Sequence, residues 1–184
     1  MKNFFLIFIA TSFFTLNINA QVVDKSISGL QTGVLGLWWH NELRMDLNWA
    51  FRTEVGYEAP YFINQEKYLM FSPVASIGTR WYYNSKKRIS NSNNTFHNSG
   101  NFAAMAVRYY PKNLAYSLIE NNRFDGGGYL VFSWGMRRNI SYRWNTELLG
   151  GIGVDPISKN AESIGENNWI LNFTIRIGYK YGMK

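Results

Sequence analysis

Residues 169–181, WILNFTIRIGYKY, decide the fold of this chain. Side chains along a strand point alternately to opposite faces, so residues of one parity share a face. One face of this segment is apolar and aromatic, the other is mostly polar or charged, and only Ile170 departs from the alternation. The apolar face consists of Trp169, Leu171, Phe173, Ile175, Ile177, Tyr179 and Tyr181, and the other face of Asn172, Thr174, Arg176, Gly178 and Lys180. A run of about thirteen residues exceeds the roughly five or six typical of soluble strands, which favours a strand that crosses a membrane.

The first twenty residues have the layout of a secretory signal. Lys2 gives the positive start, residues 4–14 form an apolar core, and residues 18–20 precede a cleavage site. An uncleaved anchor is the alternative, but the apolar core is shorter than the roughly 20 residues that a spanning helix needs. We therefore expect a cleaved signal peptide at 1–20 and a mature chain at 21–184, which has the length of one domain.

Composition narrows the class of exported protein. No later window has about 18 consecutive apolar residues, which excludes a helical membrane protein. Aromatic residues make up 17% of the chain and cysteine is absent, so a closed ladder of backbone hydrogen bonds would have to hold the fold instead of disulfides. Aromatic side chains collect at the two membrane interfaces of outer-membrane barrels. The residues predicted for these interfaces are Trp38, Trp39, Trp49, Trp81, Trp134, Trp144, Trp169, Tyr179 and Tyr181.

The basic charge balance does not indicate a nucleic-acid partner. The formal net charge is +7 and the isoelectric point is near 9.6. The Lys and Arg residues are scattered along strands and connections without a single patch, and export separates the protein from nucleic acid. The predicted partners are outer-membrane lipid and lipopolysaccharide, with the barrel-assembly machinery during insertion. No cofactor is predicted, and the ligand of the surface loops stays open.

Alternation of polarity predicts seven long strands, at 28–39, 47–58, 70–83, 101–110, 127–137, 142–154 and 168–181. Bacterial single-chain barrels have an even number of strands. We therefore expect eight, with the eighth hidden in 21–27, 84–100 or 111–124. The predicted fold class is all-β, a transmembrane antiparallel up-and-down barrel in the bacterial outer membrane.

The connections differ in length. Outer-membrane barrels have short turns in the periplasm and longer loops outside. This rule predicts tight periplasmic turns at 40–46 and 138–141, exterior loops at 59–69, 111–126 and 155–167, and both termini in the periplasm. The Ser/Asn-rich segment 84–100 is long, yet strand alternation assigns it to the periplasmic side.

Charged residues on the inward parity predict a polar lumen. They are Arg52, Glu54, Glu58, Arg80, Arg108, Arg143, Glu147, Arg176 and Lys180. The interior of an eight-stranded barrel is just wide enough to be filled by side chains. Because buried charges need partners and both signs are present, we favour a plug of paired side chains over the alternative, a narrow ion path.

Four segments of the chain carry a family resemblance. They are GVLGLWWHNELRMDLNWAFRTEVGYEA at 33–59, the aromatic run at 80–84 followed by the basic residues 86–88, the polar run 98–101, and residues 134–140. Together they resemble small outer-membrane β-barrel proteins of the Bacteroidetes and Flavobacteria. The resemblance covers essentially the whole mature chain. It implies an architecture and no particular activity.

Few residues suggest chemistry. The chain has two histidines, which makes a metal site improbable, and His40 beside two tryptophans is expected at the membrane interface. His97 and Ser99 resemble the His-x-Ser motif of outer-membrane lipid A deacylases, in which a histidine activates a serine for attack on an ester. Gly100 stands where that family has Asn, and the next downstream carboxylate is Glu120, in a loop. A polar turn is therefore favoured at this segment.

The predicted function is a structural or surface-interaction role without catalysis. A lipid A deacylase-like esterase and a small pore remain as alternatives.

Overall fold

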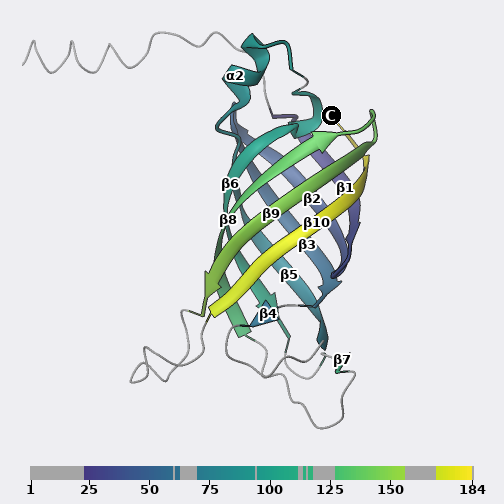
Figure 1. Cartoon of the computed structure of the whole chain (residues 1–184), viewed down its shortest axis with the longest axis vertical. Coiled ribbons are helices and arrows are strands. Elements are labelled where there is room, and N and C mark those ends of the chain that lie inside the picture. The colour runs from purple at the N-terminus through teal and green to yellow at the C-terminus, as the bar shows by residue number, and fades with distance from the viewer. Residues whose placement is uncertain are drawn as a thin grey trace, which may run out of the picture.

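The computed structural model describes residues 23–59, 61–62, 70–93, 95–111, 114, 116–117, 127–155 and 169–183. Within them, eight long antiparallel strands form a closed barrel (Figure 1). The strands are β1 (Ser26–Gly33), β2 (Gly36–Asp46), β3 (Trp49–Glu58), β5 (Met70–Trp81), β6 (Gly100–Tyr110), β8 (Gly127–Asn139), β9 (Trp144–Val154) and β10 (Trp169–Tyr181). Each pairs with its neighbour in the chain, and β1 pairs with β10. The predicted all-β up-and-down barrel of eight strands is confirmed.

Short elements lie at the two ends of this barrel. Two-residue strands, β4 (Tyr61–Phe62) and β7 (Tyr116–Ser117), pair with β10 and β5. The connection from β5 to β6 contains helix α2 (Ser85–Ser90) and a 3-10 turn, η1 (Phe96–Asn98). Within the described ranges, no helix is both long and apolar enough to cross a membrane. The predicted signal peptide, residues 1–20, lies outside the described residues.

The eighth strand arises from a hairpin that the sequence prediction missed. The predicted strand 28–39 is in fact two strands, because the chain turns at Val34 and Leu35 between β1 and β2. Two-residue hairpin turns are usually marked by Asn-Gly or Asp-Gly. Here both turn residues are apolar, so the pattern continues through the turn without a signal.

Because this hairpin was missed, the turn between the next two strands was also predicted at the wrong residues. Residues 40–46, predicted as a tight turn, continue β2, and the turn into β3 is at 47–48. Within the described residues, none of the three segments expected to hide an eighth strand supplies one of barrel length. The predicted turn 138–141 also shifts, since β8 extends to Asn139 and the connection to β9 is at 140–143.

The connections divide between two ends of the barrel. The terminus end has the turns 47–48 and 140–143, the α2 connection and the described ends of the chain (Figure 1). The loop end has the β1–β2 turn and the points where the chain leaves β3, β6 and β9 and returns in β5, β8 and β10. The three connections predicted as exterior loops therefore share one end, and the long connection 82–99 lies at the other, as strand alternation predicted.

Strand alternation gives the barrel a polar interior and an apolar exterior. In β10, the Ile175 side chain is 57% exposed on the outside, whereas Arg176, the next residue, is 3% exposed and points inside. Their partners in β9 are Leu148 and Glu147, which follow the same division. The two faces predicted for residues 169–181 are thus the two faces of the barrel wall.

The interior has three layers. A cluster at the loop end consists of Trp38, Val74, Tyr110, Tyr129, Val131 and Ile170. A cluster toward the terminus end consists of Val23, Ala50, Tyr82, Phe102 and Leu149. Charged side chains occupy the space between these two hydrophobic clusters, and that charged layer is the most distinctive feature of the molecule.

Candidate functional site

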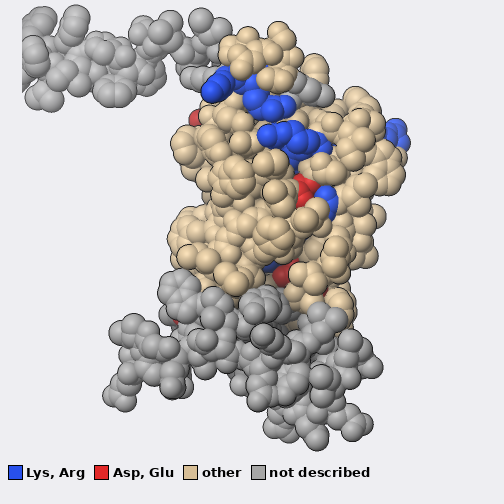
Figure 2. Space-filling model, in the orientation of Figure 1, with Lys and Arg blue, Asp and Glu red and all other residues tan. Residues whose placement is uncertain are grey.

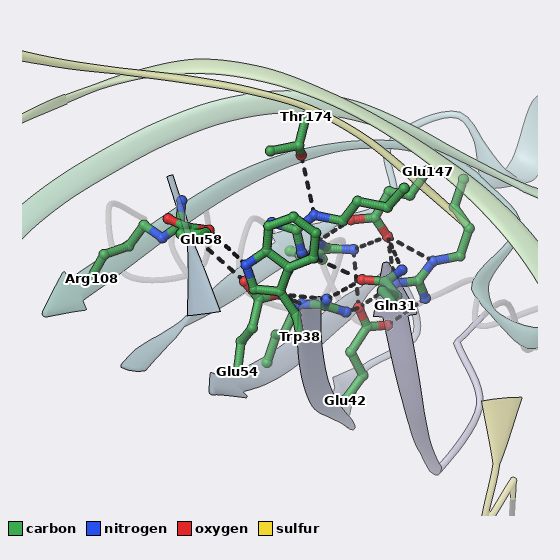
Figure 3. Close-up of polar contacts among 12 residues, drawn as sticks. Gln31, Trp38, Glu42, Glu54, Glu58, Arg108, Glu147 and Thr174 are labelled. Carbon is green, nitrogen blue, oxygen red and sulfur yellow. Dashed lines mark hydrogen bonds and ion pairs between the residues drawn. The ribbon is translucent and has the colours of Figure 1, made fainter. Parts of the chain in front are cut away.

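Nine charged side chains form the interior layer, which we call the lumen network (Figure 3). All are buried, and they come from seven of the eight long strands. The members are Arg52, Arg80, Arg108, Arg137, Arg176, Glu42, Glu54, Glu58 and Glu147. Buried charges are tolerated only when they are paired and hydrogen-bonded, so the pairing decides what this layer can do.

A ring of four residues lies on the terminus side of the network. Arg137 donates two hydrogen bonds to the two oxygens of Glu42, both at 2.9 Å. Arg80 binds Glu147 in the same bidentate manner, at 2.9 and 2.7 Å. Cross contacts close the ring, from Arg137 Nη2 to Glu147 at 2.8 Å and from Arg80 Nη1 to Glu42 at 3.1 Å. Bidentate arginine–carboxylate pairs are among the strongest and most directional contacts in proteins.

Two neutral donors and a third arginine complete the set of groups around Glu42. The Tyr82 hydroxyl and the Asn98 amide donate to its Oε2 at 3.1 and 2.8 Å, and Arg52 donates to Oε1 at 2.9 Å. Gln31 links the ring to the rest of the network, because its amide donates to Glu147 and accepts from Arg52. Both oxygens of Glu42 thus accept from several donors, which fixes this carboxylate in place.

The loop side of the network is centred on two further glutamates. Glu54 contacts three arginines: Arg52 at 2.6 Å, Arg176 at 2.8 Å and Arg108 at 3.4 Å. Arg108 also binds Glu58 at 2.8 Å.

Aromatic groups hold these charges from the loop end. The Trp38 indole and the Tyr110 hydroxyl each donate to Glu58 at 2.6 Å. The Arg176 guanidinium lies 3.8 Å from the Trp38 ring centroid, which adds a cation–π contact. On the terminus side, Arg80 lies over Phe102 at 4.1 Å. Each hydrophobic cluster is therefore bonded to the charged layer beneath it.

The structure places eight of the nine predicted lumen residues inside the barrel. Arg143 is the exception and the prediction was wrong: it lies in the exposed turn before β9 and donates to the Tyr179 hydroxyl at 2.7 Å. The predicted strand began at residue 142, two residues before β9 starts at Trp144, and alternation does not hold in the turn between them. Lys180 is buried but separate, since its ammonium donates to Asn139 at 2.7 Å.

Two members of the network were missed in the sequence. Glu42 fell in the supposed turn 40–46, so it received no face. Arg137 stood at the last position of a predicted strand, although it shares its parity with the inward-facing Tyr129 and Val131. Parity along the predicted strand 127–137 would have assigned it to the inside.

The tryptophans and tyrosines predicted for the membrane interface mostly lie on the outside. Trp49, Trp81, Trp134, Trp144 and Tyr181 are exposed there, Trp39 and Tyr179 are half-buried, and the Trp169 side chain lies outside the described part of the structure. Trp38 is the error, because it is fully buried and bonded to Glu58. The missed hairpin at Val34 had obscured which of the two adjacent tryptophans faces inward.

His40 is a second residue that lies inside rather than at an interface. It shares the inward face of β2 with Trp38 and Glu42 and is 1% exposed. Its two ring nitrogens have no hydrogen-bond partner among the described residues. A Cβ on Gly29 would come within 2.7 Å of the ring, so the glycine leaves the space that the imidazole fills.

The structure does not assemble the candidate esterase pair. His97 Nδ1 lies 2.6 Å from Asp24 Oδ2, and the Ser99 hydroxyl donates to the backbone oxygen of Arg137 at 3.4 Å. Of the hydrogen bonds between described residues, none joins His97 to Ser99. Nor do the described residues contain a group of three or more His, Cys, Asp or Glu that could hold a metal ion.

Comparison with known proteins adds no family. No protein-family model matches the chain, and no curated protein matches its sequence.

Proposed function

We propose that this protein is an outer-membrane β-barrel with a closed lumen, which acts as a rigid membrane scaffold and presents its loop-end connections at the cell surface. It performs no catalysis. Outer-membrane lipid and lipopolysaccharide surround its wall, and the barrel-assembly machinery inserts it.

The observation that carries the proposal is the reversed polarity of the barrel. A barrel that folds in water buries its apolar side chains and exposes its charges. Here the charges are buried and large apolar side chains are exposed around the wall, among them Leu37, Val55, Ile77, Val107, Phe132, Phe173 and Ile175. Figure 2 shows a mostly uncharged wall on the face that it presents, with Lys and Arg gathered near the end that carries α2. Hydrocarbon is the environment that favours such an exterior.

Outward aromatic residues at both ends support the same environment. Toward the terminus end, Trp49 stacks on Trp81 with ring centroids 6.0 Å apart, and Trp134 donates to the Tyr83 hydroxyl at 2.6 Å. Toward the loop end, Tyr57 and Tyr109 are exposed on the outside. Aromatic girdles at the two interfaces are typical of outer-membrane barrels.

The lumen network supports closure rather than conduction. An ion would have to pass two hydrophobic clusters and a layer in which bidentate arginine–glutamate pairs reach across the barrel. The apolar layers offer no ligand to an ion stripped of water. The predicted export signal, and the place of the three predicted exterior loops at the end opposite the described termini, favour an orientation with the terminus end in the periplasm.

Fluorescence quenching tests the membrane assignment. Protein refolded into phosphatidylcholine vesicles that contain brominated lipid should lose much of its tryptophan emission. Trp134→Phe should lower the amount of emission that is quenched, whereas Trp38→Phe, which changes a tryptophan inside the barrel, should leave that amount nearly constant and lower only the unquenched remainder. A folded protein that stays in the aqueous phase, or outward tryptophans that are not quenched, would refute membrane insertion.

Planar-bilayer recording tests closure separately. The wild type should give no stepwise current. Reproducible steps would replace the scaffold with the pore alternative while leaving the membrane assignment intact.

A further inference from the structure

The lumen network is not electrically balanced. It contains five arginines and four glutamates. An uncompensated buried charge is costly, and a barrel wall whose outside is apolar gives the excess charge little solvent. The network therefore calls for one more negative charge.

A cavity lies beside the excess charge. It has a volume of about 50 Å³ and is lined by four of the five arginines, Arg52, Arg80, Arg108 and Arg176. Glu54 also lines it, but this carboxylate is already shared by three of those arginines. Since a single water molecule needs roughly 10–15 Å³, the cavity has room for a small ion with one or two waters.

Small residues on one wall create this space. The cavity is bounded there by Ser76, Gly78, Ala104, Ala106 and Ser133, from the adjacent strands β5, β6 and β8. The arginines come from β3, β5, β6 and β10 and approach the same space. The two serines add hydroxyl donors, which suit an anion as well as water.

We propose that this cavity binds one small monovalent inorganic anion, of the class of chloride, which completes the charge balance of the lumen network. Guanidinium groups supply most of the electrostatic attraction and the serine hydroxyls supply further donors. The inference rests on the interior geometry alone, so it does not depend on where the barrel resides.

Bromide is the direct probe. Crystals of the full chain in detergent, grown in sodium bromide, should give an anomalous peak between Arg108 and Arg176 in the cavity. The same crystals in sodium gluconate, whose anion is too large to enter, should give no ordered anion there. A cavity that holds only water in saturating bromide would overturn the proposal.

Thermal unfolding gives an independent measure. An anion that binds only the folded barrel raises the unfolding midpoint with the logarithm of its concentration. The rise should be roughly 3–5 °C per tenfold increase in chloride once the site is mostly filled, measured with gluconate keeping ionic strength constant. An equal midpoint in chloride and gluconate would contradict the site.

Ser133→Asp tests the charge argument. A carboxylate at this position supplies the missing charge from inside the cavity, so the variant should lose its response to chloride and its bromide peak. Ser133→Asn, of the same size but neutral, should keep the chloride response. Should Ser133→Asp fail to fold, the pair Ser76→Asp and Ser76→Asn makes the same comparison from a second position on that wall of the cavity. A carboxylate variant that folds and still binds bromide would refute the charge-balance explanation.

Discussion

Arg137 and Glu42 meet across the full width of the barrel. Their strands, β8 and β2, lie four places apart in a ring of eight, so they are on opposite walls. The guanidinium and the carboxylate nevertheless form two parallel hydrogen bonds of 2.9 Å each. This pair is therefore a strut that fixes the distance between the two walls.

Removal of one side of that strut should be strongly destabilising. Arg137→Met leaves Glu42 and Glu147 short of a partner, and breaking a buried pair costs about 3–5 kcal/mol. The free energy of unfolding in urea, measured with the protein in lipid vesicles, gives the loss. Arg143→Met is the matched control, since Arg143 is exposed and its change should stay within about 0.5 kcal/mol. Equal losses in the two variants would contradict a structural role for the network.

Neighbouring residues of β10 test the two faces of the wall. Ile175→Arg puts a cation on the outside near mid-strand, which should cost roughly 2–4 kcal/mol if that face is in hydrocarbon. Ile175→Leu should be nearly neutral. The same vesicle unfolding assay applies, and an Ile175→Arg variant of normal stability would indicate that water surrounds the wall.

Arg176→Leu should cost less than Arg137→Met. Glu54 loses one arginine but keeps its contact with Arg52 at 2.6 Å and with Arg108. Leucine also preserves part of the packing against Trp38. Side-by-side unfolding curves decide the order, and a larger loss for Arg176→Leu would show that the loop side of the network is the more important.

Two glycines, Gly56 on the inner face and Gly150 on the outer face, test where the wall has room for a side chain. A Cβ at Gly56 would come within 2.6 Å of Trp38 and 2.5 Å of the Leu37 oxygen, so Gly56→Ala should cost about 1–3 kcal/mol. At Gly150 the nearest atom is 3.8 Å away, and Gly150→Ala should be neutral or stabilising by about 0.5–1 kcal/mol. Near-ultraviolet circular dichroism should report a moved Trp38 in the first variant only. Unchanged spectra and stability in Gly56→Ala would mean that the indole has room to shift.

The geometry at Ser99 predicts no esterase activity. Its hydroxyl is bonded to the Arg137 backbone, and His97 is paired with Asp24. Wild type and Ser99→Ala should therefore release equally little fatty acid from lipopolysaccharide, and a fluorophosphonate probe should label neither. Labelling of the wild type that disappears in Ser99→Ala would restore the esterase hypothesis.

Most of the wall was predictable from the sequence because period-two alternation is strong in long strands. Arg52, Glu54, Arg80 and Arg176 were assigned to the inside from parity alone, and the structure places them there. Each of these positions lies inside both the predicted and the observed strand. Parity is least ambiguous there.

The errors share one physical cause, which is that alternation says little about where a strand ends. The Val34-Leu35 turn is apolar and lacks a turn residue, so two strands merged into one and the faces of Trp38, His40 and Glu42 were lost. The sequence also could not predict which interior side chains contact one another. Even a correct parity says only which face a residue occupies, and not that Arg137 and Glu42 meet across 95 positions of chain.

The seam between β1 and β10 has a consequence for the order of folding. It joins residues 28–33 to residues 176–181, so the ring cannot close until the last strand has been made. Contacts between such distant segments form slowly. Inside the seam, Gln31 accepts from Arg176 and donates to Glu147, so the polar interior bridges the joint as soon as the strands meet. One edge of β1 therefore stays unpaired until β10 has been made. The charged side chains of the lumen then also hold these two strands together.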